Sequence, residues 1–142
     1  MLRTYIFAGL AFSYIVIIWI MSGLPHNTII ELPSKGFDTF FKESLHLIEF
    51  AILYLLLATF FLSASKFTPK INMFIALISS FYGVIDEIHQ SFVPYRTAST
   101  IDVIKDCIGV IVCWYLVHQA VFYQRFPIIV SFIEKILNRK FE

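Results

Sequence analysis

Residues 71–90 read INMFIALISSFYGVIDEIHQ, an apolar segment that ends in Asp86, Glu87, His89 and Gln90. The segment is long enough to cross a bilayer, since about 20 helical residues span the hydrocarbon region. A charged side chain at the centre of a membrane helix costs roughly 2.5–3.5 kcal/mol, so a set of charges beside apolar helices needs partners or water and usually serves a function. This stretch therefore predicts a membrane helix with a functional site at its end.

The whole chain has the composition of an integral membrane protein. Of its 142 residues 58% are hydrophobic, 16 are phenylalanine, and the mean hydropathy is +0.78, whereas soluble domains are roughly 45–50% apolar. We expect an all-α fold, an integral membrane four-helix bundle formed by residues 1–125. Its predicted transmembrane segments are 4–24, 45–64, 71–85 and 101–121.

The charges favour one orientation of this bundle. The formal net charge is +1 and no basic run occurs, so nucleic acid is not an expected partner. Lys and Arg near the ends of membrane helices prefer the cytoplasm. Seven Lys and Arg residues fall on the side that carries both termini and four fall on the opposite side. This asymmetry predicts cytoplasmic termini. The two sets are Arg3, Lys66, Lys70, Arg125, Lys135, Arg139 and Lys140, against Lys35, Lys42, Arg96 and Lys105.

Residues 126–142 form a second region. Pro127 suits the first turn of a new helix, and the residues after it place Ile and Phe side chains on one side and Glu, Lys, Asn and Arg on the other. This pattern predicts an amphipathic helix at the inner membrane surface, in contact with the lipid bilayer. The alternative is a tail that packs on the bundle and has no role in lipid binding.

Polar side chains recur at helical spacing at one end of three predicted helices, so those of each helix share a face. With a rise of about 1.5 Å per residue, Glu49, Asp86 and Asp106 lie roughly 5–10 Å below the outer helix ends. We therefore expect one polar pocket that opens to the outer face. Its residues are Lys42, His46 and Glu49 on the second helix, Asp86, Glu87, His89 and Gln90 on the third, and Asp102 and Asp106 on the fourth.

Acids outnumber bases in this set. The natural counter-ions are Lys42, Arg96 and Lys105, against five carboxylates. The acidic excess either takes up protons or receives a cation or a positively charged ligand group. For Asp102 a structural alternative is open, namely a helix-start acid paired with Lys105. His118 falls near the inner end of the last span and is expected at the membrane interface.

These motifs resemble those of the VanZ-like membrane proteins, named for a teicoplanin-resistance accessory protein. The resemblance covers about residues 22–113, in which several motifs occur in the family's order and spacing. The chain departs from the pattern at Tyr95, where Gly is common, and at Cys113, where a second small residue often follows Gly109. The matching motifs are Lys42-x-x-x-His46-x-x-Glu49-Phe50, Asp86-Glu87-x-His89-Gln90-x-Phe92-Val93-Pro94-x-Arg96 and Asp102-x-x-x-Asp106-x-x-Gly109.

The resemblance implies a four-helix protein of the bacterial cell membrane, multi-pass, which in some members is linked to reduced susceptibility to glycopeptides or lipoglycopeptides. It supplies no established reaction, and neither it nor the residues identify a cofactor. The positions that match the family's site are Lys42, His46, Glu49, Glu87, Gln90, Arg96, Asp102 and Asp106.

Three functions fit the polar residues. The first is a protein that binds a lipid-linked or amphiphilic envelope ligand, such as a lipoglycopeptide, at the outer leaflet. The second is a membrane hydrolase or transferase that acts through a metal. In a variant without metal, Glu87 or Asp102 with a raised pKa is the acid–base catalyst, and Arg96 holds an anionic group such as phosphate. The third is a purely structural set of ion pairs that fixes helix register. The weak metal-ligand candidates are His46, Glu49, Asp86 and His89.

Overall fold

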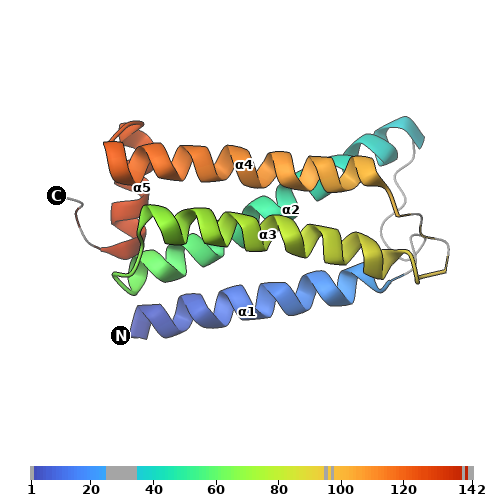
Figure 1. The fold of residues 1–142 in the computed structure, drawn as a ribbon, viewed down its shortest axis with the longest axis horizontal. Coiled ribbons are helices and arrows are strands. Elements are labelled where there is room, and N and C mark those ends of the chain that lie inside the picture. The colour runs from blue at the N-terminus through green and yellow to red at the C-terminus, as the bar shows by residue number, and fades with distance from the viewer. Residues whose placement is uncertain (1, 25–34, 95, 97, 139, 141–142) are drawn as a thin grey trace.

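The fold of the described residues is all-helical, as predicted, with no strand among them. The computed structural model describes residues 2–24, 35–94, 96, 98–138 and 140, with side chains in α2 described at residue 45 and from residue 47 onward. Four long helices lie alongside one another and a short fifth helix crosses one end (Figure 1). They are α1 (Leu2–Ser22), α2 (Lys35–Ser63), α3 (Pro69–Gln90), α4 (Thr100–Tyr123) and α5 (Pro127–Leu137).

Two of these helices, α1 and α3, are long and apolar enough to cross a membrane, as judged over the described residues. The apolar part of α2, Leu47–Ser63, is shorter. Many large apolar side chains on the outer faces of the bundle are exposed, among them Phe12, Leu77 and Ile111, which suits a lipid environment more than water. The structure thus supports membrane character, and the prediction of four spans stays a prediction.

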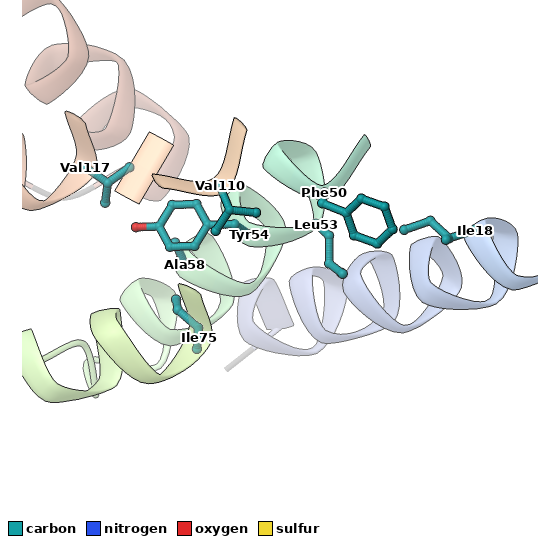
Figure 2. Packing of buried hydrophobic residues seen from close by; sticks show 8 residues of the cluster. All are labelled: Ile18, Phe50, Leu53, Tyr54, Ala58, Ile75, Val110 and Val117. Atoms are coloured by element: carbon teal, nitrogen blue, oxygen red, sulfur yellow. The ribbon is translucent and has the colours of Figure 1, made fainter. Parts of the chain in front are cut away.

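The apolar core is centred on α2 (Figure 2). Phe50 and Tyr54, one helical turn apart, are fully buried. Ile18 of α1 points toward the Phe50 ring, and Val110 of α4 lies beside Tyr54. Because α2 packs on α1, α3 and α4, and most extensively on α4, any polar residue one turn from this core is held between helices rather than facing lipid.

The contact between α2 and α4 depends on Gly109. A Cβ atom at this position would overlap the backbone carbonyl oxygen of Leu47. Small residues at such positions let two membrane helices approach backbone to backbone. Cys113, where the family pattern often has a smaller residue, is half-buried and packs against the core.

A sharp corner joins α4 to α5. Gln124 and Phe126 adopt left-handed backbone conformations, with φ of 53° and 60°, and Pro127 then starts α5. The tail therefore contains a helix over Pro127–Leu137, and its place at the inner membrane surface stays a prediction. It packs on the bundle through the buried Leu137 while its opposite side stays exposed.

Candidate functional site

Carboxylates from α2, α3 and α4 meet at the end of the bundle opposite α5. Asp106 of α4 is fully buried and Asp86 of α3 is 2% exposed. Repulsion from Glu87, Glu49, Asp86 and Asp102 acts on Asp106, and Asp86 also repels Glu49. The structure thus brings together the five acids that the sequence placed at one level, and we call them the carboxylate cluster.

Asp106 sits against a glycine. A Cβ atom on Gly83 of α3 would lie 3.1 Å from Asp106 Oδ2 and 3.2 Å from Asp106 Cβ. Such contacts are tighter than most real ones. Gly83 therefore provides the space in which the Asp106 carboxylate fits between α3 and α4.

Asp86 is held from one side by its own helix. Its Oδ2 accepts a hydrogen bond from Gln90 Nε2, one turn later, at 2.6 Å. Its other oxygen, Oδ1, is buried without a hydrogen-bond donor among the described residues. A buried carboxylate oxygen without a donor is unfavourable, so this atom is available to a proton or a cationic group.

Glu87 ties α3 to the start of α4. The backbone N–H of Ser99 donates to Glu87 Oε2 at 2.9 Å, and Ser99 in turn caps α4 by accepting from the Ile101 N–H. Glu87 is almost fully buried. This catalytic candidate therefore has a structural contact that the sequence did not predict.

Asp102, the other catalytic candidate, pairs with Lys105. Lys105 Nζ lies 3.0 Å from Asp102 Oδ1, with both side chains about one-fifth exposed. The pair has i, i+3 spacing in the first turns of α4, which matches the structural alternative left open for Asp102.

Arg96 fastens the loop between α3 and α4 to the end of α1. Its Nε donates to the Leu24 carbonyl at 2.9 Å and its Nη2 donates to the Met21 carbonyl at 3.1 Å. The last carbonyls of a helix lack intrahelical donors, and a cation there also suits the helix dipole. Arg96 attracts Glu49 electrostatically, so it still serves as a nearby counter-charge for the cluster.

His89 faces α1 rather than the carboxylates. Its ring stacks on Trp19 with centroids 4.0 Å apart and an interplanar angle of 8°. Its Nδ1 lies 3.0 Å from Ser22 Oγ, in a hydrogen bond. These contacts give His89 a role in joining α3 to α1.

The metal hypothesis gains no support from the described part of the chain, which contains no group of three or more His, Cys, Asp or Glu side chains placed to hold a metal ion. Lys42 and His46 lie on α2, but their side chains fall outside the described residues. Their predicted places in the pocket therefore stay predictions.

Two tyrosines at this level attach α1 to the bundle, of which Tyr82 shares the polar face of its helix by sequence spacing while Tyr14 was not singled out from the sequence. The Tyr14 hydroxyl of α1 donates to the backbone carbonyl of Glu49 at 3.2 Å. The Tyr82 hydroxyl of α3 donates to the Ile15 carbonyl at 3.0 Å. Both contacts end on backbone oxygens, which carry no sequence signature, and both attach α1 to the helices that bear the carboxylates.

A second buried polar group lies nearer the other end of the bundle. The Tyr54 hydroxyl donates to Asn72 Oδ1 at 2.6 Å, and Asn72 Nδ2 is 3.2 Å from His118 Nδ1. Trp114 stacks on His118, with centroids 5.5 Å apart. His118, which was expected at the membrane interface, hydrogen-bonds to the fully buried Asn72 and so joins α4 to α3. Its depth in a membrane stays a prediction.

The arrangement offers negative charge and hydrogen-bond acceptors from five carboxylates. Its buried part consists of Asp86, Glu87 and Asp106, whereas Glu49, Asp102 and Arg96 are partly exposed. Such a set can hold a proton or a cationic group, and its arginine can orient an anionic one.

Comparison with known proteins agrees with the motif pattern. The model of the VanZ/LLP1 family matches residues 5–123, which include most of α1 and all of α2, α3 and α4. No curated protein and no solved structure matches the chain.

Proposed function

This chain belongs to the VanZ/LLP1 family, and from that membership we propose that it binds a lipid-linked or amphiphilic envelope ligand in the bacterial cell membrane. Through this binding it lowers susceptibility to lipoglycopeptides such as teicoplanin. The observation that carries the proposal is the carboxylate cluster, because acids from three different helices converge at one level of an apolar bundle. Ionisable groups within a membrane bundle are costly and mark functional sites by default.

The proposal includes four membrane spans with cytoplasmic termini. The lengths of α1 and α3 support it directly. For α2 and α4 the support is their packing alongside α1 and α3 (Figure 1). Arg3, Lys66 and Arg125 lie at the end that carries the termini, which would face the cytoplasm under the positive-inside rule. The carboxylate cluster would then lie toward the outer leaflet, where envelope ligands are found.

The ligand would be amphiphilic because of where the cluster lies. Phe81 and Ile104 are exposed on the outer faces of α3 and α4, and Phe92 follows the end of α3. An apolar tail could rest on such side chains in the bilayer while a polar head group reaches Glu49 and Asp86. Binding sites that combine apolar walls with a few converging polar groups are typical for such ligands.

A structural role for part of the site is the second candidate. It is favoured by two contacts, from Glu87 to the Ser99 N–H and from Arg96 to the α1 carbonyls. In this proposal these two residues shape the site, while Glu49, Asp86 and Asp106 contact the ligand. The two groups should therefore respond differently to substitution.

The test is teicoplanin and vancomycin susceptibility in a sensitive Gram-positive host that expresses the full chain. Wild type is compared with Glu49→Gln and Asp86→Asn, which remove one charge each with little change of shape. Glu134→Gln removes a charge from α5, at the other end of the bundle, and serves as the matched control. Membrane abundance of every variant is quantified in parallel.

We expect wild type and Glu134→Gln to protect against teicoplanin, and Glu49→Gln and Asp86→Asn to protect less at equal abundance. Equal protection by all four would show that the cluster does not bind the ligand. Loss of the two site variants from the membrane would mean that Glu49 and Asp86 have a structural role and would contradict their assignment as ligand contacts. No protection by any version would contradict the resistance role in this chain.

A further inference from the structure

The exposed side of α5 carries an apolar surface that the bundle does not use. Ile128 is 86% exposed and Phe132 is 63% exposed, one turn apart. The opposite side of the same helix packs on the bundle through the buried Leu137 and the half-buried Ile133. The helix is thus apolar on two sides, and only one of them contributes to the fold.

The position of α5 is fixed, so this surface points in a defined direction. Arg3 Nη1 of α1 donates to the Ile136 carbonyl of α5 at 3.4 Å, and α5 also contacts α4 and α2. It crosses the end of the bundle at a steep angle to the long helices (Figure 1). A helix across the end of a membrane bundle lies in the plane of the interface.

Basic side chains flank the apolar pair. Lys135 is exposed on the same face as Ile128 and Phe132, since 128, 132 and 135 follow i, i+4, i+7 spacing. Arg125 precedes the helix and is exposed, with its guanidinium carbon 6.0 Å from the centre of the Tyr123 ring. Lys140 follows the helix and is also exposed.

The corner before α5 displays a further aromatic residue. Phe126 is 43% exposed although it occupies a left-handed backbone conformation, which is uncommon for a bulky residue. The turn thereby leaves the Phe126 side chain partly exposed at the position just before α5.

From these observations we propose that the face formed by Ile128, Phe132 and Lys135, together with Phe126 and Arg125, binds anionic phospholipid at the membrane surface. This face is called the α5 foot. The two apolar side chains enter the boundary between head groups and acyl chains, and the basic side chains meet the phosphates. The choice of an anionic lipid rests on charge complementarity, because the exposed polar residues that flank the apolar pair include Arg125, Lys135 and Lys140.

Each basic side chain is expected to contribute only a modest preference for anionic over neutral phospholipid. A Lys or Arg near an anionic bilayer surface strengthens attachment about fivefold, or about 1 kcal/mol. The foot does not depend on the carboxylate cluster at the other end of the bundle. A failure of the ligand proposal would therefore leave it standing, and the reverse also holds.

The test places a spin label on the foot of the full-length protein in vesicles. Cys107 and Cys113 are replaced by Ser, and Ile128→Cys is labelled with a nitroxide. Lys66→Cys, exposed in the turn between α2 and α3 at the same end, is the matched control label. Collision of each label with oxygen and with a water-soluble nickel complex is compared in phosphatidylglycerol and in phosphatidylcholine vesicles.

In phosphatidylglycerol we expect the label at 128 to be reached by oxygen and shielded from nickel, while the label at 66 stays open to nickel. In phosphatidylcholine, or after Lys135→Gln and Arg125→Gln together, the label at 128 should become more accessible to nickel. A label at 128 as open to nickel as the label at 66 in both lipids would overturn the proposal. Equal shielding in both lipids, unaffected by the two Gln substitutions, would overturn its anionic selectivity.

A double substitution on the exposed side of α5 gives a second test. Ile128→Ser and Phe132→Ser together remove the apolar pair without touching the packed side of α5. If the foot binds lipid, a label at Ser131→Cys should lose its shielding from nickel in phosphatidylglycerol vesicles when this pair is removed. Unchanged shielding would show that α5 is held by the bundle alone.

Discussion

Gly109 of α4 lies so close to Leu47 of α2 that a Cβ atom on residue 109 would overlap the Leu47 carbonyl oxygen. We therefore expect Gly109→Ala to lower the free energy of unfolding by about 1–3 kcal/mol, since extra atoms in a well-packed contact force the backbones apart. Thermal unfolding in detergent and membrane abundance are the measurements.

Gly9→Ala is the control for this substitution, because a Cβ atom on Gly9 of α1 would have no neighbour within 4 Å. Its stability should be unchanged, or higher by up to about 1 kcal/mol from the better helix propensity of Ala. Equal stability of the two Ala variants would contradict the backbone contact.

Tyr54→Phe should weaken the buried polar group on α2, α3 and α4. The substitution removes the donor to Asn72 Oδ1 and leaves that oxygen buried, at a cost of about 0.6–2 kcal/mol. In a double-mutant cycle with Asn72→Ala the two effects should not add. Tyr5→Phe, at an exposed position on α1, is the control and should have no effect. Full additivity would mean that the hydroxyl and the amide act independently.

Arg96→Ala should loosen the end of α1. The Met21 carbonyl accepts from Arg96 Nη2 and also from the Leu24 N–H, so loss of the guanidinium leaves the last turn with fewer partners. We expect faster hydrogen exchange at the Leu24 amide, on the order of tenfold, for a loss of about 1.5 kcal/mol in hydrogen bonds from a charged donor.

Arg96→Lys should restore only part of this protection, because an ammonium lacks the planar fork that reaches two carbonyls. Lys105→Met is the control, since a partly exposed i, i+3 pair contributes no more than about 0.5 kcal/mol. Unchanged exchange at Leu24 in Arg96→Ala would show that the α1 end needs no cap.

Comparison of Glu87→Gln with Glu87→Leu should show whether Glu87 stabilises the protein through its hydrogen-bond-accepting oxygen or through its negative charge. The amide oxygen of Gln can still accept from the Ser99 N–H that bonds Glu87 Oε2, so abundance should stay near wild type. Leu cannot accept, and leaving that N–H without a partner should cost about 1–3 kcal/mol. If both variants lose abundance equally, the negative charge itself holds the loop in place. The measurement is membrane abundance with thermal unfolding in detergent.

Gln124→Gly should stabilise the corner between α4 and α5 by up to about 1 kcal/mol, because Gly adopts the left-handed conformation without a Cβ penalty. The Gln124 backbone N–H, which donates to the Gln119 carbonyl, is unchanged by this substitution. Gln124→Ala keeps the Cβ atom and should show no gain. A gain of equal size in both would indicate that the Gln side chain, not its backbone, is unfavourable.

The positions of the helices could be predicted from the sequence where long apolar segments mark them. The segment predicted at 4–24 corresponds to α1, and the acidic end of residues 71–90 is helical up to Gln90. The start of α2 did not follow, since the helix begins at Lys35, well before the apolar segment at 45. Hydropathy measures the affinity of side chains for lipid. It therefore detects the apolar part of a helix and misses a polar part that continues beyond it.

The carboxylates of α2, α3 and α4 act on one another electrostatically, which agrees with the common depth predicted from the helical rise, while their role as a binding site stays a prediction. Their partners were harder to predict. Arg96 and Glu87 bond to backbone groups, which every residue carries and no motif marks. The stacking of His89 on Trp19 could not be predicted either, because the rotation of α3 about its own axis depends on packing with α1.

The close crossing of α2 and α4 also bears on how the chain is made. A ribosome releases the N-terminal helices first. The α2 helix therefore leaves the ribosome while α4, which carries Gly109, is still being synthesised. Until α4 arrives, α2 lacks its most extensive partner. The packing of the bundle is therefore completed only by its last long helix, and a nascent chain that stops after α3 lacks the most extensive contact of α2.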